Sequence, residues 1–180
     1  MMLELSAHEA APMLVAMGLN LRRLEARDRR LAAIHEAGHH VMAIHCGMRE
    51  VESWIERAGD PTRFCTKSWI GHCQFRNPSP GSSTQDTMIG VAGMIAANLW
   101  GAGNDPDRMD YIYDLLDDPD CMSESDWHMA GLNYGTVLTK AQRRKIEAAL
   151  DLLRGPLWSE LLRQARTLIV ESRDIDVGDG

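Results

Sequence analysis

The chain has 180 residues, of which 44% are hydrophobic, so it is long enough for one globular domain with a substantial core. Its formal net charge is −7, and the segment from Asn104 to Asp126 holds nine acidic residues against one arginine. The chain therefore lacks the basic stripe of a nucleic-acid-binding surface, and none of its apolar runs approaches the ~18 residues of a membrane span. We expect no nucleic-acid partner and no membrane span.

The cysteines and the N-terminal segment bear on the cellular compartment. Four cysteines are present, and no two of them form a C-x-x-C pair, which argues against a structural zinc knuckle. The first twenty residues have no basic segment followed by an apolar one, which a secretory signal would contain. Free thiols and the lack of such a signal predict a reducing, cytoplasmic location.

The N-terminal segment is predicted to be helical. Residues 1–19 are typical of a short amphipathic helix that is interrupted near Pro12 or Gly18. No residue in this segment belongs to a recognisable catalytic pattern. We interpret residues 1–27 as a helical arm that packs on a neighbouring molecule.

A longer helix is predicted over residues 21–46, with Gly47 as its C-terminal stop. The spacing of its apolar residues predicts a buried face. The residues expected on this face are Leu24, Leu31, Ile34, Val41 and Met42. The second half of this helix contains the most informative motif of the chain.

That motif is His35-Glu36-Ala37-Gly38-His39, which has the pattern H-E-x-x-H. Residues four apart lie one turn apart on nearly the same face of a helix, so His35 and His39 can bind one Zn²⁺ ion. Glu36 then lies close enough to act as a general base on a metal-activated water. His40 lies one position beyond this face and is interpreted as a supporting residue.

Two strands are predicted next, at residues 51–56 and 68–75, separated by a turn at residues 58–61. A hairpin beside the H-E-x-x-H helix would either offer an edge strand to an extended peptide or simply cover the core. Both interpretations remain open at this point. On the first of them, Gly71 and His72 are candidate substrate-binding residues.

The rest of the chain is predicted to be helical apart from a loop at residues 77–84 and a polar tail at residues 173–180. The first of these helices, residues 86–100, is rich in glycine and alanine, so we expect it to pack closely against the H-E-x-x-H helix. Ser123 is predicted to cap a helix whose first turn contains Asp126. Further helices are predicted at residues 111–116, 139–154 and 157–171.

A catalytic zinc site needs a third protein ligand. His45 extends the spacing of the motif, but Met42 stands where glycine would let the chain leave the helix, so His45 should point away from the metal. A glutamate is also excluded in the expected region, because none occurs between Glu56 and Glu124. Asn98 is a poor zinc ligand. Aspartates remain as candidates.

Three segments together resemble the peptidase domain of FtsH-type zinc proteases. Residues 34–39 resemble the HEAGH helix of that family, residues 92–99 its small-residue helix, and residues 125–130 the helix start that supplies an aspartate ligand. The resemblance covers roughly residues 28 to 170. It implies a mainly α (α+β), zincin-like peptidase domain over residues 28–172, with a small β-hairpin beside the H-E-x-x-H helix.

The resemblance implies a zinc-dependent metalloendopeptidase that acts on peptides or unfolded proteins, with Asp126 as the third zinc ligand. Asp105 is the rival ligand, because residues 101–105 match another family motif, but Pro106 and the early position favour Asp126. The chain departs from the family in lacking its acidic pair near Asn98 and its ATPase module. These departures leave two expectations open: a separate ATPase or a homo-oligomer as partner, and a non-catalytic zinc-binding interaction or regulatory domain.

Overall fold

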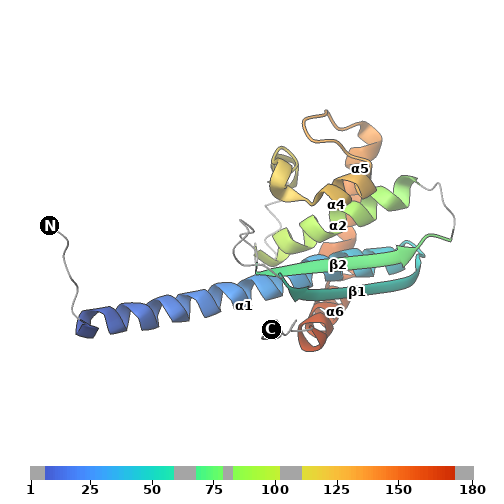
Figure 1. The fold of residues 1–180 in the computed structure, drawn as a ribbon. Helices are drawn as coiled ribbons and strands as arrows, with labels where there is room; N and C mark the ends of the chain where they lie inside the picture. Colours follow the sequence, from blue (N-terminus) through green and yellow to red (C-terminus); the bar gives the residue numbers. More distant parts are fainter. Residues whose placement is uncertain (1–6, 59–67, 79–82, 102–110, 173–180) are drawn as a thin grey trace.

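The computed structural model describes residues 7–58, 68–78, 83–101 and 111–172. Within these ranges the protein is mainly helical with one two-stranded antiparallel sheet, as the sequence predicts (Figure 1). The strands are β1 (Arg49–Arg57) and β2 (Trp69–Arg76). The helices are α1 (Ala7–His45), α2 (Ser83–Gly101), α3 (Tyr111–Leu115), α4 (Glu124–Ala130), α5 (Lys140–Arg154) and α6 (Trp158–Glu171), with a short 3-10 helix, η2, at Pro119–Cys121.

Helix α1 runs without a break over 39 residues, so the predicted interruption near Pro12 or Gly18 is wrong. A glycine inside a helix costs only about 1 kcal/mol, and a proline in the second turn forgoes a hydrogen bond near one end. Cooperative extension of a long helix outweighs both costs. The N-terminal part of α1 extends away from the other elements (Figure 1).

The structure also corrects two predicted core positions. Leu24 is 55% exposed, and Leu31 is only partly buried. Ile34, Val41 and Met42, further along the same helix, are buried as predicted. The hydrophobic spacing therefore identified the helix, whereas the length of helix that is covered depends on the other elements.

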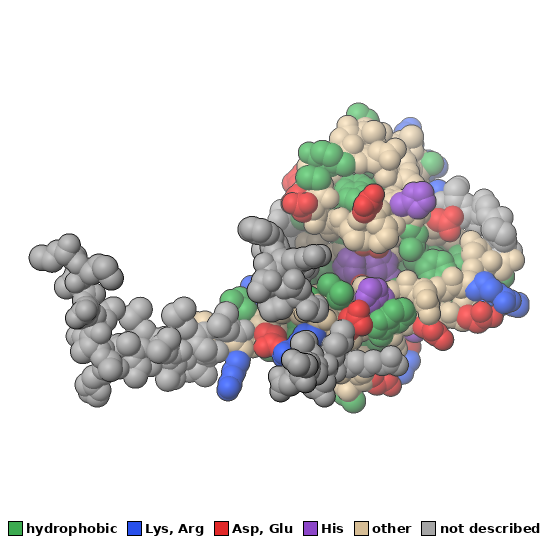
Figure 2. Space-filling view, in the orientation of Figure 1, with side chains coloured by type: hydrophobic (Ala, Val, Ile, Leu, Met, Phe, Trp, Pro, Cys, Tyr) green, Lys and Arg blue, Asp and Glu red, His purple; other side chains and the backbone are tan. Residues whose placement is uncertain are grey.

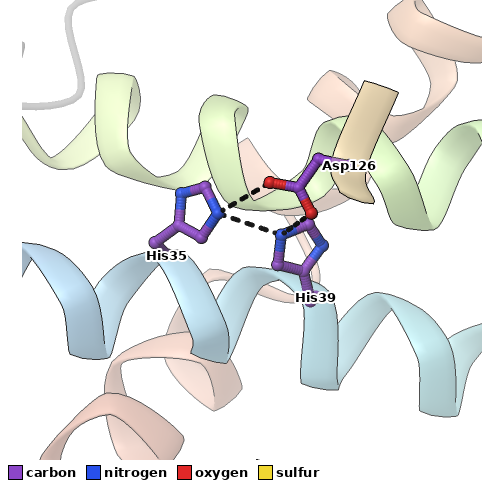
Figure 3. A group of neighbouring side chains, drawn as sticks. All are labelled: His35, His39 and Asp126. Carbon is purple, nitrogen blue, oxygen red and sulfur yellow. Dashed lines mark hydrogen bonds and ion pairs between the residues drawn. The ribbon is translucent and has the colours of Figure 1, made fainter. Parts of the chain in front are cut away.

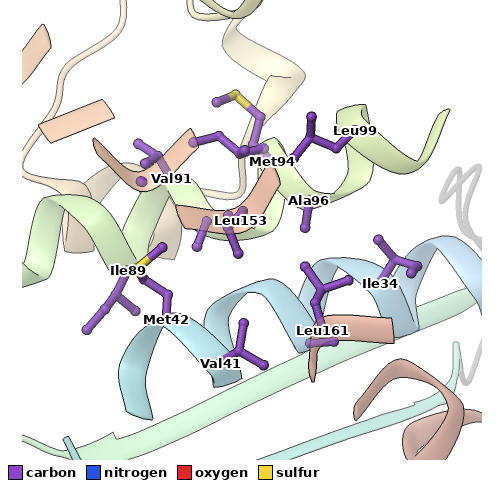
Figure 4. Packing of buried hydrophobic residues seen from close by; sticks show 14 of the residues in the cluster. Ile34, Val41, Met42, Ile89, Val91, Met94, Ala96, Leu99, Leu153 and Leu161 are labelled. Carbon is purple, nitrogen blue, oxygen red and sulfur yellow. The ribbon is translucent and has the colours of Figure 1, made fainter. Parts of the chain in front are cut away.

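The core lies between α1, α2, α5 and α6, which surround one cluster of aliphatic and methionine side chains (Figure 4). Met42 from α1, Ile89 from α2, Leu153 from α5 and Leu161 from α6 are all almost completely inaccessible to solvent. Within the described ranges, none of the helices combines the length and the apolar character that crossing a bilayer requires.

Helices α1 and α2 approach closely where their small residues meet, as predicted. A Cβ atom added at Gly38 would lie 2.6 Å from the carbonyl oxygen of Ala92 and 2.7 Å from the Cβ of Ala96. Gly90 likewise allows α4 to approach α2 closely, since a Cβ there would lie 2.4 Å from the backbone nitrogen of Ala130. Both glycines meet the backbone of another helix, so a methyl group at either position would force two helices apart.

The predicted hairpin is present, with Ile55 of β1 opposite Gly71 of β2. Its second strand is fixed to α1 by Asp28, whose Oδ2 accepts hydrogen bonds from the backbone nitrogen and the hydroxyl of Ser68 at 3.1 and 2.8 Å. The hairpin therefore runs along α1 on the side next to the H-E-x-x-H motif. The predicted turn at residues 58–61 lies mostly outside the described residues.

Candidate metal centre

Three side chains from two helices converge at one point (Figure 3). His35 and His39 come from α1, and Asp126 comes from the first turn of α4. The two histidine Nε2 atoms lie 3.1 Å apart. The Nε2 atom of His35 lies 3.3 Å from Oδ2 of Asp126, and that of His39 lies 3.3 Å from Oδ1.

The three side chains lie close enough together to hold one metal ion. A zinc ion bound at about 2.0–2.1 Å by each ligand holds neighbouring ligand atoms about 3.3–3.4 Å apart. The 3.1 Å between the two Nε2 atoms is close to that value, and each Nε2 atom lies 3.3 Å from a different oxygen of Asp126. One ligand atom from each of the three residues lies within 4.8 Å of the others. Two imidazoles and one carboxylate are also a typical protein ligand set for zinc in hydrolases, where the fourth position belongs to water.

The orientation of His39 strengthens the fit. Its Nδ1 atom lies 2.7 Å from the carbonyl oxygen of Ile89, which can only accept a hydrogen bond, so Nδ1 carries the proton. In a neutral imidazole, Nε2 is then left with a bare lone pair facing Asp126 Oδ1. Two acceptors at this distance repel each other unless a positive charge, from a proton or a metal, lies between them. The backbone of α2 thus sets the ring in the state that a metal requires.

Asp126 is oriented by the helix on which it lies. It occupies the third position of a capping box in which Ser123 is the N-cap of α4. The hydroxyl of Ser123 accepts a hydrogen bond from the backbone nitrogen of Asp126 at 3.2 Å, and Oδ2 of Asp126 accepts one from the backbone nitrogen of Ser123 at 3.4 Å. The carboxylate therefore turns back over the helix start, toward the two histidines.

The electrostatics of the three groups are mutually reinforcing. Burial alone would raise the pKa of Asp126, but hydrogen bonds from His35 and His39 outweigh it and hold that pKa well below its usual range. Burial alone would lower the pKa of His39, but the bond to Asp126 and its charge reverse the direction, and the pKa is raised. The group as a whole therefore favours a positive charge at its centre.

Glu36 lies beside this group and is 6% exposed. Burial raises its pKa, and the nearby His35 and His39 oppose that shift. Its side chain packs against β2 at Gly71, where an added Cβ would lie 2.3 Å from Cγ of Glu36. The carboxylate of Glu36 is thus held between the metal-facing side of α1 and the hairpin.

The group is open to solvent on one side. The side chain of His35 is 25% exposed, whereas those of His39 and Asp126 are 4% and 9% exposed. Histidine side chains are visible near the centre of the face shown in Figure 2. A ligand can therefore approach from the side of His35.

The other predicted candidates lie apart from the three-residue group. His45 is exposed at the end of α1, as its helical position predicts. The Nδ1 atom of His40 is hydrogen-bonded to the hydroxyl of Ser53 at 3.0 Å, which fits a supporting residue. Asn98 donates to the carbonyl oxygen of Met94 in its own helix. The rival ligand Asp105 lies outside the described residues.

His72 lies on β2 of the hairpin, where its ring contacts Trp54 and Glu56 of β1. Its ring stacks on Trp54, with centroids 4.9 Å apart. Its Nε2 atom is 3.3 Å from Oε1 of Glu56, an ion-pair distance without the geometry of a hydrogen bond. Gly71, the other predicted substrate-binding residue, is the one that contacts Glu36.

Sequence reasoning missed the part of the site that backbone atoms supply. The carbonyl group of Ile89 orients His39, and a carbonyl group leaves no trace in the residue type. The capping box was visible as Ser123 followed three residues later by Asp126, but its effect on the ligand carboxylate was not predicted.

The fold and the site together define a mainly helical domain with an H-E-x-x-H helix and an aspartate from a second helix beside it. No protein-family model matches the chain, and no curated protein matches it.

Proposed function

We propose that this protein is a zinc-dependent metalloendopeptidase. The observation that carries the proposal is the convergence of His35, His39 and Asp126 at ligand spacing, with the buried carboxylate of Glu36 beside them. The H-E-x-x-H pattern alone requires two histidines on one helix face. The meeting with an aspartate 87 residues further along the chain than His39 is independent support.

In this proposal His35, His39 and Asp126 hold the metal. Zinc supplies a Lewis acid that lowers the pKa of a water molecule and polarises the scissile carbonyl group. Glu36 takes the proton from the attacking water and later delivers it to the leaving amine. Burial raises the pKa of Glu36 above its ordinary value, which makes its carboxylate a stronger base.

The test is a comparison of wild-type protein with Glu36→Gln. The variant should bind zinc with unchanged stoichiometry, because Glu36 is not a ligand, and its cleavage of casein should fall about 10²–10⁴-fold, because the general base is lost. Treatment with a chelator should abolish wild-type cleavage, and added zinc should restore it. Undiminished cleavage by Glu36→Gln would refute the catalytic scheme.

A second candidate is a non-catalytic zinc-binding interaction or regulatory domain with the same fold. The observation that favours it is the burial of Glu36, which leaves little of its carboxylate accessible to a substrate. Stoichiometric zinc binding without cleavage of casein or other unfolded proteins would support this candidate over the peptidase.

The resemblance to FtsH-type zinc proteases belongs to the same proposal. Support comes from the order of the elements that carry it: the H-E-x-x-H helix, the small-residue helix α2 packed on it, and the capped start of α4. An unfolded protein or a flexible peptide is the proposed substrate, and a separate ATPase or a homo-oligomer is the proposed partner. The three cysteines within the described ranges, Cys46, Cys73 and Cys121, are free thiols, which supports a reducing, cytoplasmic location.

A further inference from the structure

Two glycines of the described chain face the side chains of the candidate centre. A Cβ atom added at Gly93 of α2 would lie 2.3 Å from Nε2 of His39 and 2.5 Å from Nε2 of His35. A Cβ atom added at Gly71 of β2 would lie 2.3 Å from Cγ and 2.5 Å from Oε1 of Glu36. All four distances are far below any van der Waals contact, so these two positions tolerate no side chain while the neighbouring side chains keep their present arrangement.

The consequence at Gly93 follows from the size of a metal ion. Zinc lies about 2.0–2.1 Å from the nitrogen of a histidine ligand. A methyl group at position 93 would approach the same two nitrogens to 2.3 and 2.5 Å, nearly as closely as the metal itself. The histidines would have to turn away from this methyl group, and their two Nε2 atoms could then no longer bind the same metal ion.

The consequence at Gly71 concerns Glu36. The strand backbone forms the surface on which the Glu36 side chain rests, because Gly71 lacks a side chain. Pairing with Ile55 of β1 fixes the strand at this point, so the strand cannot easily retreat. A methyl group there would displace the carboxylate instead.

We propose that Gly93 and Gly71 are positioning residues of the centre with separate tasks. The bare backbone at Gly93 keeps both histidine nitrogens available to the metal, and the bare backbone at Gly71 holds the Glu36 carboxylate beside them. The inference rests on the proposed function. It assigns metal binding and general-base catalysis to different glycines on different elements.

The two positions differ from Gly38 and Gly90 in what an added methyl group meets. At Gly93 and Gly71 it meets side-chain atoms of His35, His39 and Glu36. At Gly38 and Gly90 it meets backbone atoms of a neighbouring helix. Alanine at the first pair should therefore damage the site and lower the unfolding midpoint less than alanine at the second pair, which should damage the fold.

The experiment compares Gly93→Ala and Gly71→Ala with two reference variants. Gly101→Ala is the matched control at the end of α2, because an added Cβ there meets no atom of the described residues within 4 Å. Gly90→Ala is the reference for damage to the fold. Each protein is titrated with zinc, assayed for casein cleavage, and unfolded by heat in the metal-free form.

We expect Gly93→Ala to bind zinc more than ~100-fold more weakly than the wild-type protein. This loss is larger than the roughly 10–100-fold that follows when a residue hydrogen-bonded to a metal ligand is removed. The metal-free unfolding midpoint of Gly93→Ala should fall less than that of Gly90→Ala. Gly71→Ala should bind zinc like Gly101→Ala and lose about 10²-fold in kcat with little change in KM, as a displacement of about 1 Å can cause.

The double variant Gly71→Ala/Glu36→Ala tests the Gly71 assignment without an assay of activity. If Gly71 acts through Glu36, Gly71→Ala should lower the metal-free unfolding midpoint in the wild-type background and not in the Glu36→Ala background. An equal decrease in both backgrounds would overturn the assignment of Gly71.

The outcomes separate the two proposals. Wild-type protein that binds no zinc would refute the proposed function itself. Wild-type protein that binds zinc, with Gly93→Ala binding it equally well, would overturn the present inference alone. A midpoint for metal-free Gly93→Ala as low as that of Gly90→Ala would also overturn it, because the glycine would then serve the fold.

Discussion

Helix α1 carries polar side chains on two sides, and the two sets of side chains differ in whether the protein itself satisfies their hydrogen-bonding groups. Toward the hairpin, His40 shares a hydrogen bond with Ser53, and Asp28 accepts two hydrogen bonds from Ser68. Toward α2 and α4, His39 turns Nε2, which has no proton in the neutral ring, toward a carboxylate oxygen. The first arrangement is complete within the protein, whereas the second needs a positive charge to complete it. Adjacent histidines on one helix can therefore be a structural residue and a ligand.

The largest expected effect distinguishes those adjacent histidines directly. His39→Ala should lower zinc affinity by more than ~100-fold, since it removes a proposed ligand and not merely a residue that hydrogen-bonds to one. His40→Ala should leave zinc affinity within about threefold of wild type, because its hydrogen bond is made on the other side of the helix. Isothermal titration with zinc measures both. Equal losses in the two variants would break the distinction between the two sides.

The two aspartates allow a second comparison. Asp126→Asn should weaken zinc binding by about 100-fold, because the amide keeps an oxygen but loses the charge. Asp28→Asn should leave zinc binding unchanged and cost about 1 kcal/mol of stability, since its hydrogen bonds to Ser68 are no longer charge-assisted. Zinc titration and urea unfolding of both variants provide the measurements. Tight zinc binding by Asp126→Asn would move the third ligand elsewhere, with Asp105 the next candidate.

A smaller effect is expected from the cap that orients Asp126. Ser123→Ala should cost about 1 kcal/mol of stability, as the loss of an N-cap does, and about tenfold in zinc affinity. Thr139→Ala removes the corresponding capping box of α5, whose N-cap is Thr139 and whose partner is Gln142. It should cost similar stability and leave zinc affinity unchanged. A parallel loss of affinity in both variants would indicate a general loosening of the fold.

The smallest effect on zinc affinity is expected for a variant on the hairpin side of α1. The Ser53 hydroxyl is hydrogen-bonded to Nδ1 of His40 at 3.0 Å and accepts a hydrogen bond from Nε2 of Gln164 at 3.3 Å. Ser53→Ala should therefore lower the free energy of unfolding by about 1–2 kcal/mol, since both partners lose a bond. Zinc affinity should not change. Denaturant unfolding of the metal-free protein, with zinc titration alongside, is the appropriate measurement.

The sequence allowed much of the fold to be predicted, because helical periodicity and capping residues are local signals. The predicted hairpin and the helices that end near Arg154 and Glu171 are present within one or two residues, and the helix predicted at residues 86–100 begins three residues earlier, at Ser83. The exposure of Leu24 was not predicted, since it depends on where the other elements meet α1. The break near Pro12 was predicted from residue preferences that a long cooperative helix overrides.

The candidate site also has parts that the sequence predicted and parts that it could not predict. The histidine pair is a matter of spacing on one helix, so it could be predicted from sequence alone. Asp126 was predicted through a resemblance, and the structure brings it to the two histidines. The carbonyl of Ile89 and the direction of the missing Cβ at Gly93 could not be predicted, because both depend on the rotation of α2 against α1.

The capping box of α4 would link binding of the proposed metal to local unfolding. The Asp126 carboxylate both closes the start of this seven-residue helix and is the proposed ligand from it. A helix of this length is unstable by itself, so its first turn depends on that carboxylate remaining in place. If zinc binds only when the turn is closed, opening of α4 and release of the metal become one event. Amide hydrogen exchange in α4 should then slow in proportion to zinc saturation, as thermodynamic linkage requires.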